Sequence, residues 1–347
     1  MKNLRTQLHL LLFFVLVVLS HKTIAQIKTL EGKNITTSDV DKFIKKQMDS
    51  LEIPAISIAI IEDGKIVYYQ ASGIKNNEKQ SIDTYTLFEA ASMTKPVFAY
   101  AVHKLIKKGF LDLDTPLYKY YPYEDIQYDD RNKLITARMV LSHTTGLPNW
   151  REDGSKLAFI ANPGEKYGYS GEGYEYLGKV AAHLTNKKIE DIIEEEVFNP
   201  FDIKNSYLIK NKYVEEHLAD GLKDNKYWGK NQLWQQPGVA YSLCTESKEY
   251  AKFIMALIKE SDTPGSIFQD MALPQLETEP QKSICLGIFC KKKPYGLKYS
   301  HSGNNNNRYN SNFEFYKDSK IGFVFFMNCH KGLEFTKRLN DFLINGR

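Results

Sequence analysis

Residues 91–106, ASMTKPVFAYAVHKLI, join a serine-x-x-lysine tetrapeptide directly to a helical pattern. The apolar residues that recur at helical spacing are Val97, Phe98, Ala101, Val102, Leu105 and Ile106. Ser92 therefore falls at a predicted helix N-terminus, and Lys95 faces the same side of that helix. A serine hydroxyl is a weak nucleophile until a base takes its proton. Lys95 can be that base if the helix end and burial lower its pKa well below about 10.4.

The tetrapeptide is not specific by itself, because the same spacing recurs at Ser72 and Lys75. Ser72 follows a predicted strand and precedes Gly73, with no helical pattern after it, so we expect a turn there. For Ser92 the alternative is an ordinary helix N-cap. The tetrapeptide alone does not distinguish a catalytic nucleophile from a helix N-cap, so the other motifs of the chain are needed.

A Gly- and Tyr-rich segment, 163–174 (PGEKYGYSGEGY), precedes another helical pattern. Tyr169 in such a loop could be held rigidly in a cleft. Its hydroxyl could relay a proton if a nearby cation lowers its pKa from about 10. The alternative is a tyrosine that packs at the surface.

Residues 299–304 (YSHSGN) join a predicted strand to a loop. Gly303 lets the backbone approach a ligand closely, and the N–H of Asn304 could pair with that of Ser92 to hold an oxyanion. His301 would be a titratable donor beside them, which predicts a pH dependence near neutrality that His301→Lys removes. The alternative is a hydrogen-bonded structural histidine.

Strand patterns gather at the two ends of the chain. An N-terminal pair surrounds the turn dipeptide Asp63-Gly64, which indicates a hairpin. The predicted strands are 55–61, 65–69, 285–290, 297–300, 312–316 and 321–327. Because sequential strands usually pair, we expect one antiparallel sheet closed by both ends of the chain.

Helical patterns dominate the middle of the chain and also flank the strands. The predicted helices are one capped by Ser38, then 97–108, 137–143, 173–185, 188–197, 246–259 and 333–343. This order predicts an α+β fold within one domain, 26–347, in which helices cover both faces of the sheet. The sheet lobe would comprise about 38–90 plus 281–347, with a mostly helical lobe at about 91–280. We expect the site in the cleft between the lobes.

The three motifs stand in the order and at the broad spacing of the class C β-lactamase-related serine hydrolases, which the chain resembles over about residues 38–344. That family includes penicillin-binding DD-peptidases, D-amino-acid peptidases and esterases. Flanking segments that also resemble the family are 141–148 (LSHTTGLP), 199–202 (NPFD) and 242–245 (SLCT). The resemblance implies a β-lactamase/DD-peptidase-like fold, an antiparallel sheet flanked by helices with an inserted helical lobe.

The resemblance implies a role for each motif residue. Ser92 would be the nucleophile, Lys95 its activating base, and Tyr169 a proton shuttle that also serves deacylation. The implied reaction passes through an acyl-serine intermediate on an amide, a D-amino-acid peptide or an ester, and it needs no cofactor and no metal.

The C-terminal motif departs from the β-lactamase pattern of this family. His301 and Gly303 occupy the places of the family's Lys-Thr-Gly lysine and glycine, and the N–H groups of Ser92 and Asn304 would form the oxyanion hole. Because His301 replaces a charged lysine, recognition of a β-lactam carboxylate is weakened. Gly171 stands where β-lactamases place the asparagine of Tyr-x-Asn, so an amide for the substrate's acylamino group is missing. Both departures favour the peptidase and esterase branches.

The sequence supports other functions to different degrees. A β-lactamase proper, and a penicillin-binding sensor that acylates with little turnover, remain alternatives. The chain has no Gly-x-Ser-x-Gly elbow of an α/β-hydrolase, and neither His-Glu-x-x-His nor clustered Cys and His for a metal hydrolase. His143 lies at a predicted helix end, where we expect a structural role.

The first 25 residues are typical of a secretory signal peptide. Lys2 and Arg5 precede an apolar run, 10–19, and Thr23-Ile24-Ala25 offers a small-residue cleavage site. A membrane-spanning helix needs about 20 apolar residues, twice the length of this run. We therefore expect an exported bacterial protein, periplasmic or secreted, with no transmembrane anchor after cleavage.

The charge balance bears on partners. The chain has 46 Lys and Arg against 42 Asp and Glu, and three of the basic residues lie in the leader. A nearly neutral remainder argues against a nucleic-acid partner. We expect a monomer whose partner is a small-molecule, short-peptide or ester substrate.

The four cysteines, Cys244, Cys285, Cys290 and Cys329, show no zinc-binding spacing. Cys285 and Cys290 fall in one predicted strand. Their odd separation would place them on opposite faces, about 16 Å apart. We expect all four to be buried as small hydrophobic residues.

Overall fold

The computed structural model describes residues 26–209, 211–228 and 236–347. The predicted signal peptide, residues 1–25, lies outside the described residues. The chain begins with a short hairpin, β1 (Gln26–Lys28) and β2 (Asn34–Thr36), and continues into α1 (Thr37–Leu51). Thr36 caps α1 in place of Ser38. The Thr36 hydroxyl accepts the N–H of Asp39 while the Asp39 carboxylate accepts the N–H of Thr36, which satisfies two backbone donors at once.

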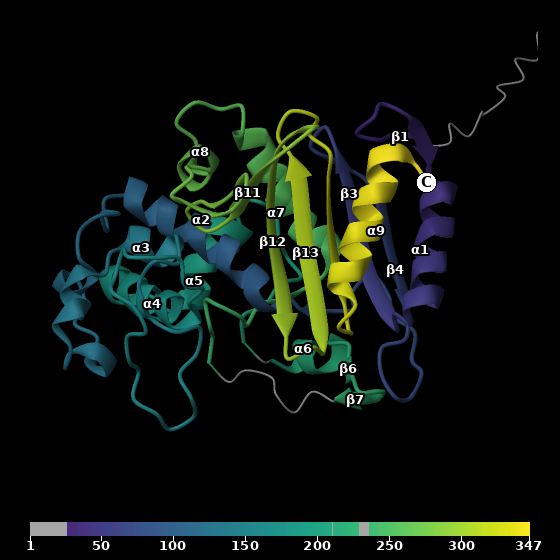
Figure 1. Ribbon diagram of the computed structural model, residues 1–347. Coiled ribbons are helices and arrows are strands. Elements are labelled where there is room, and N and C mark those ends of the chain that lie inside the picture. Colours follow the sequence, from purple (N-terminus) through teal and green to yellow (C-terminus); the bar gives the residue numbers. More distant parts are fainter. Residues whose placement is uncertain (1–25, 210, 229–235) are drawn as a thin grey trace, which may run out of the picture.

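One eight-stranded antiparallel sheet forms the centre of the molecule (Figure 1), in the order β4-β3-β14-β13-β12-β11-β10-β9. Its strands are β3 (Ala55–Glu62), β4 (Lys65–Gly73), β9 (Leu276–Glu279), β10 (Lys282–Ile284), β11 (Phe289–Lys293), β12 (Gly296–Asn305), β13 (Tyr309–Tyr316) and β14 (Gly322–Met327). The N-terminal hairpin joins the C-terminal strands where β3 pairs with β14, with Ala59 opposite Val324. The predicted sheet, closed by both ends of the chain, is confirmed.

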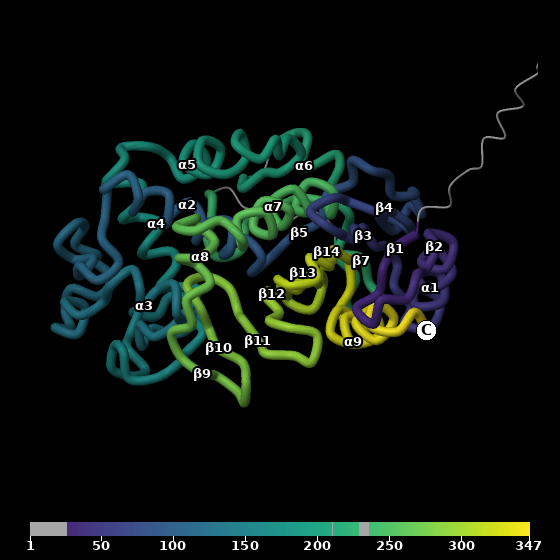
Figure 2. The backbone as a smooth tube through the Cα atoms, turned by 90° about the horizontal axis from the view of Figure 1, so that it is seen from above, coloured from purple at the N-terminus to yellow at the C-terminus, as the bar shows by residue number. Residues whose placement is uncertain are grey.

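Helices cover both faces of this sheet (Figure 2). They include α1 and α9 (Gly332–Asn345) on one face, and α2 (Thr94–Lys107), α7 (Ser247–Glu260) and α8 (Ile267–Met271) on the other. The alternation along β14 explains the two layers. Phe323 and Phe325 join the apolar cluster formed with α1 and α9, whereas Val324 and Phe326 join the cluster formed with α2 and α7. Because α7 packs on β3 and β14, it lies against the sheet, although its residues fall within the range of the predicted helical lobe.

Further elements build the helical lobe and its connections, together with the 3₁₀ turns Leu117–Lys119, Glu124–Ile126 and Asp130–Leu134. They are α3 (Ala137–Leu141), α4 (Gly171–Thr185), α5 (Ile189–Ile193), a π turn (Glu194–Phe198) and α6 (Lys212–His217), with two short pairs, β5 (Phe88–Glu89) with β8 (Cys244–Thr245), and β6 (Gly221–Lys223) with β7 (Lys226–Trp228). Within the described ranges no helix has the length and apolarity to cross a bilayer.

Three local predictions were wrong. Ser72 lies in β4, opposite Ile56, and not in a turn. Residues 301–304 continue β12 and do not begin a loop. Residues 285–290 are not one strand, because the chain reverses at Gly287, whose φ of +104° is accessible mainly to glycine. The last difference brings Cys285 and Cys290 together, with their sulfur atoms 3.0 Å apart.

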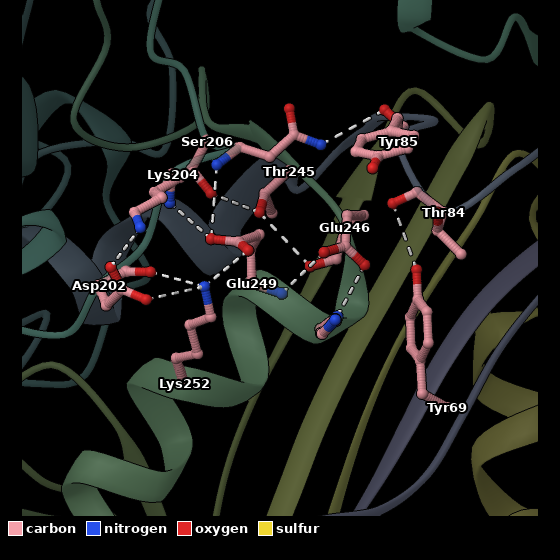
Figure 3. A network of polar contacts seen from close by, with 12 residues as sticks. Tyr69, Thr84, Tyr85, Asp202, Lys204, Ser206, Thr245, Glu246, Glu249 and Lys252 are labelled. Atoms are coloured by element: carbon pink, nitrogen blue, oxygen red, sulfur yellow. Dashed lines mark hydrogen bonds and ion pairs between the residues drawn. The ribbon is translucent and has the colours of Figure 1, made fainter.

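A polar network fixes the start of α7 (Figure 3). The Glu246 carboxylate caps the helix by accepting the N–H of Glu249 at 2.9 Å, and Glu249 pairs with Lys252 at 2.7 Å. The N–H of Ser247 donates to the hydroxyl of Ser57 on β3 at 3.1 Å. The segment before this helix has its own contacts near Ser92: the N–H of Leu243 donates to the Thr94 hydroxyl at 3.1 Å, and the Leu243 carbonyl accepts the N–H of Ala90 at 2.8 Å.

Candidate active site

Ser92 lies in a single 3₁₀ turn directly before α2. The preceding Ala91 has φ +49°, a left-handed conformation that a side chain disfavours. The Thr94 hydroxyl donates to the Ala91 carbonyl at 2.7 Å. The Tyr250 hydroxyl donates to the carbonyl of Met93 at 2.8 Å. These contacts on both sides of Ser92 hold the strained turn, while its side chain stays partly exposed.

Lys95 is fully buried in the first turn of α2. Its Nζ lies 3.3 Å from Ser92 Oγ and donates to the Ala240 carbonyl at 2.8 Å. Burial lowers the pKa of Lys95 to about 7, against a smaller opposing attraction from Glu175. A substantial fraction of Lys95 is therefore neutral at neutral pH and able to accept a proton from Ser92.

Glu175, on α4, is the acidic group beside Lys95. Its carboxylate accepts the N–H of Ala240 at 3.0 Å, so both charged side chains hold the same residue. Burial raises the pKa of Glu175 to about 7, which the Ala240 N–H and Lys95 partly oppose. Glu175 could not be recognised from the sequence, because a single acidic residue within a helical pattern is not a specific signal.

Tyr169 lies in the loop before α4, with its ring close to Lys95. Its ring lies 4.8 Å from Lys95 Nζ, measured to the ring centroid. Burial raises the pKa of Tyr169 above its usual value, and a hydrogen bond with Ser92 only partly opposes this. The expected lowering by a nearby cation is therefore not found. At neutral pH Tyr169 carries its proton and can donate it.

His143 packs against the ring of Tyr169. The two rings stack with centroids 4.2 Å apart. The N–H of Ser170 donates to His143 Nδ1 at 3.0 Å, so the proton of the neutral ring resides on Nε2. Burial holds the pKa of His143 well below its usual value, and Lys95 lowers it further. His143 is therefore a neutral positioning residue for Tyr169, consistent with the structural role expected from the sequence.

Gly171 begins α4 under the ring of Trp150. A Cβ on Gly171 would lie 2.5 Å from the indole and 2.9 Å from the Asn149 carbonyl oxygen, so an asparagine has no room there. Asn149 itself is exposed and lines the cavity, and its Oδ1 accepts the N–H of Gly171 at 3.1 Å. Its amide nitrogen is a donor near the site that no motif of the sequence indicated.

His301, Gly303 and Asn304 follow one another along β12. Pairing with β11 ends at Ser300, so beyond that residue this edge of β12 borders the Ser92 turn. A Cβ on Gly303 would overlap the carbonyl oxygen of Ala90, two residues before Ser92. Only glycine allows this approach of the two backbones. Asn304 lines the cavity, and its side-chain amide donates to Asn307 Oδ1 at 2.8 Å.

His301 is not the donor titrating near neutral pH that the sequence predicted. Burial lowers its pKa to about 3, and Lys95 contributes in the same direction. Its Nδ1 lies 2.9 Å from the Ser302 carbonyl, which requires the proton on Nδ1. The buried Nε2 is then an acceptor, and it has no partner. A pH dependence near neutrality must therefore arise from other groups, of which Lys95 and Glu175 are the candidates.

These residues open onto a cavity of about 690 Å³. Ser92, Tyr169 and His301 line one part of it, and Lys282, Lys291, Lys293 and Lys298 line another, together with Glu279 and Glu314. Among the residues that the structure describes, no three His, Cys, Asp or Glu side chains are grouped to hold a metal ion.

Comparison with known proteins places this arrangement in a family. The sequence profile described as Beta-lactamase matches residues 40–345. Protein flp of Staphylococcus aureus (strain MW2) is 25% identical over 240 residues, which cover 62% of this chain and 48% of that protein. Esterase EstB of Burkholderia gladioli is 35% identical over 102 residues, 28% of this chain and 26% of the esterase. The chain thus spans about half the length of flp.

Two solved structures share the fold. A penicillin-binding protein homologue from Pyrococcus abyssi, described as octameric, has a TM-score of 0.74 at 23% identity and covers 90% of this chain and 78% of its own. A class C beta-lactamase mutant has a TM-score of 0.78 at 18% identity, covering 89% of this chain and 97% of its own. The chain belongs to the beta-lactamase family, within the beta-lactamase-related serine hydrolase superfamily.

Proposed function

We propose that this protein is a serine hydrolase that forms an acyl-enzyme at Ser92 with an ester, an amide or a D-amino-acid peptide. The observation that carries the proposal is the pair Ser92 and Lys95. A fully buried lysine, whose pKa burial lowers to about 7, lies within hydrogen-bond distance of a partly exposed serine hydroxyl. This combination supplies both a base and a nucleophile.

Acylation follows from this geometry. Neutral Lys95 takes the Ser92 proton as Oγ attacks the carbonyl carbon, and the resulting ammonium is held by the Ala240 carbonyl and by Glu175. The developing oxyanion is directed toward the N–H of Ser92 and the unpaired edge of β12. Tyr169 donates a proton to the leaving group. In deacylation Tyr169 takes a proton back from the water that attacks the acyl carbon, and Lys95 returns its proton to Ser92 Oγ as the acid leaves. General-base help and oxyanion stabilisation each contribute on the order of 100-fold or more in rate.

Two features of the site support an ester or small peptide over a β-lactam. Neutral His301 offers an acceptor and no fixed positive charge, so it would not attract a carboxylate. Trp150 fills the space that an asparagine at position 171 would need. The name of the relative esterase EstB agrees with an ester substrate.

We further propose that the protein acts as a monomer exported by way of residues 1–25.

Labelling with a fluorophosphonate probe tests the nucleophile. We expect covalent labelling at Ser92, and none in Ser92→Ala. The parent is then assayed in parallel with a short-chain nitrophenyl ester, a D-amino-acid peptide and a chromogenic cephalosporin. Turnover of the ester or peptide in excess of the cephalosporin supports the proposal. No labelling at Ser92, with Ser92→Ala behaving like the parent, would refute it; labelling without turnover would indicate a sensor, and preference for the cephalosporin a β-lactamase.

Tyr169→Phe separates the two halves of the reaction. The variant keeps the ring that stacks on His143 but loses the hydroxyl beside Ser92. Fluoride and nitrophenolate leave without an added proton, so fluorophosphonate labelling and acylation by a nitrophenyl ester should persist. Steady-state turnover of that ester should fall about 100-fold, with the acyl-enzyme accumulating. Intact-mass analysis of enzyme quenched during turnover measures that accumulation. Parental turnover in Tyr169→Phe would remove Tyr169 from the mechanism.

Glu175→Gln tests the electrostatics of Lys95. Glutamine still offers an acceptor to the Ala240 N–H but removes the negative charge that raises the pKa of Lys95. The pKa of Lys95 should therefore fall, and a nearby charge typically shifts a pKa by about 1–3 units. We expect the acid limb of kcat/KM to move to lower pH by about one unit or more. Glu194→Gln, an exposed acid in the π turn, is the control; an unmoved limb in Glu175→Gln would contradict the assignment.

A further inference from the structure

The turn between β10 and β11 brings two cysteines together beside the active-site cavity. Cys285 directly follows β10, and Cys290 lies in β11, opposite Ser283. The turn is closed by the N–H of Cys285, which donates to the carbonyl of Ile288 at 2.8 Å. Both cysteines are almost completely buried, and their sulfur atoms are 3.0 Å apart.

This turn packs against the helices α8, α3 and α2. The N–H of Leu286 donates to a carbonyl of α8 at 2.9 Å, and the N–H of Gly287 donates to a carbonyl of α3 at 3.0 Å. A Cβ on Gly287 would overlap that of Ala99, one helical turn after Lys95 on α2. After the turn, Phe289 lines the cavity with its ring 5.6 Å from that of His301. The position of the hairpin therefore bears directly on the site.

We propose that Cys285 and Cys290 form a disulfide bond that closes this hairpin against α2. A disulfide has an S–S length of about 2.05 Å, so the two sulfur atoms need to approach by only about 1 Å. The other two cysteines offer no competing partner at this point, because Cys244 and Cys329 lie in two separate apolar clusters. The bond is independent of the chemistry at Ser92.

The oxidation balances with a small-molecule disulfide such as oxidised glutathione. The thiolate of Cys290 attacks one glutathione sulfur, forms a mixed disulfide and releases the first reduced glutathione. The thiolate of Cys285 then attacks Cys290 Sγ and releases the second. Two thiols lose two protons and two electrons, which the two glutathione molecules receive. The Cys285 thiol donates to Cys290 Sγ and lowers the pKa of Cys290, consistent with Cys290 attacking first.

Peptide mapping tests the bond directly. Trypsin cleaves after Lys282 and Lys291, so both cysteines fall in one peptide, 283–291. The purified protein is equilibrated with reduced and oxidised glutathione, blocked with N-ethylmaleimide under denaturing conditions and digested. We expect most of peptide 283–291 to be unblocked and lighter by two hydrogens than the reduced peptide. Cys244 and Cys329 should each carry one maleimide.

Variants and a stability measurement complete the test. Cys285→Ser cannot resolve the mixed disulfide, so its Cys290 should carry either a maleimide or one glutathione, and Cys244 and Cys329 one maleimide each. Cys329→Ala should still protect peptide 283–291. Dithiothreitol should lower the melting temperature of the parent and of Cys329→Ala, but not that of Cys285→Ser. Two maleimides on peptide 283–291 in the glutathione-treated parent, or a disulfide that includes Cys244 or Cys329, would overturn the proposal even if the variants failed to fold.

Discussion

Replacing Lys95 by alanine is expected to slow acylation of Ser92 by on the order of 100-fold or more at every accessible pH. No other basic side chain donates a hydrogen bond to Ser92 among the contacts of the described residues. The rate of fluorophosphonate labelling and the pre-steady-state burst with a nitrophenyl ester both measure this step. Ser92→Ala provides the baseline.

Controls for Lys95→Ala separate lost chemistry from lost packing. Lys95 is completely buried, so truncation leaves a cavity, and Lys95→Met restores most of the volume without a titratable group. Both variants should show this loss of acylation while retaining a cooperative melting transition. Lys104→Ala, later on the same helix, should behave like the parent. Parental acylation rates in Lys95→Met would show that another group is the base.

The parent should also show the pH dependence of a neutral lysine base. Because burial lowers the pKa of Lys95 to about 7, the neutral fraction rises as the pH increases through that value. Acylation should increase about tenfold per unit below pH 7 and reach a plateau above it. His301→Lys is not expected to abolish this limb, since the pKa of His301 lies at about 3.

Gly303→Ala is expected to have the second large effect. Its Cβ would overlap the Ala90 carbonyl oxygen, so β12 must move away from the turn that carries Ser92. The oxyanion donors on the two segments then separate, and losing one such donor costs about 100- to 1000-fold in kcat. Steady-state kinetics with the nitrophenyl ester measure the loss, and we expect kcat to fall more than KM rises.

Gly168→Ala is the matched control for this substitution. It introduces the same methyl group beside the site, but nothing lies within 4 Å of its Cβ position. We expect near-parental activity from Gly168→Ala and a folded, slow Gly303→Ala. If Gly303→Ala kept parental kcat, close contact between β12 and the Ser92 turn would not be needed for catalysis.

Local signals in the sequence explain what could be predicted. Ser92 and Lys95 are three residues apart on one helix, so their contact depends on helical geometry alone. The hairpin at Asp63-Gly64 and the alternating C-terminal strands likewise reflect local periodicity. Sequential pairing then led from these strands to the antiparallel sheet. Motif order further identified the family, because it holds over most of the chain.

Contacts between distant segments could not be predicted in this way. Glu175 and Ala240 reach Lys95 from other parts of the chain, and Asn149 meets Gly171 only after the loops before α4 fold. The predicted strand 285–290 failed because its apolar run hides a reversal at Gly287, whose close contact with α2 is a tertiary feature. Apolar periodicity does not distinguish a strand from a buried turn.

The sequence by itself therefore determined the family, the helix that presents Ser92 and Lys95, and most of the sheet. Only the tertiary structure decided the protonation states and the contacts of these residues. A pKa is set by desolvation and by neighbouring charges, which come from segments far apart in the chain. Burial lowers the pKa of Lys95 to about 7 and keeps His301 neutral, and a folded turn brings Cys285 to Cys290. Sequence spacing specifies which residues can meet along one helix or strand. The burial of each residue and its contacts with distant segments are set only when the chain folds.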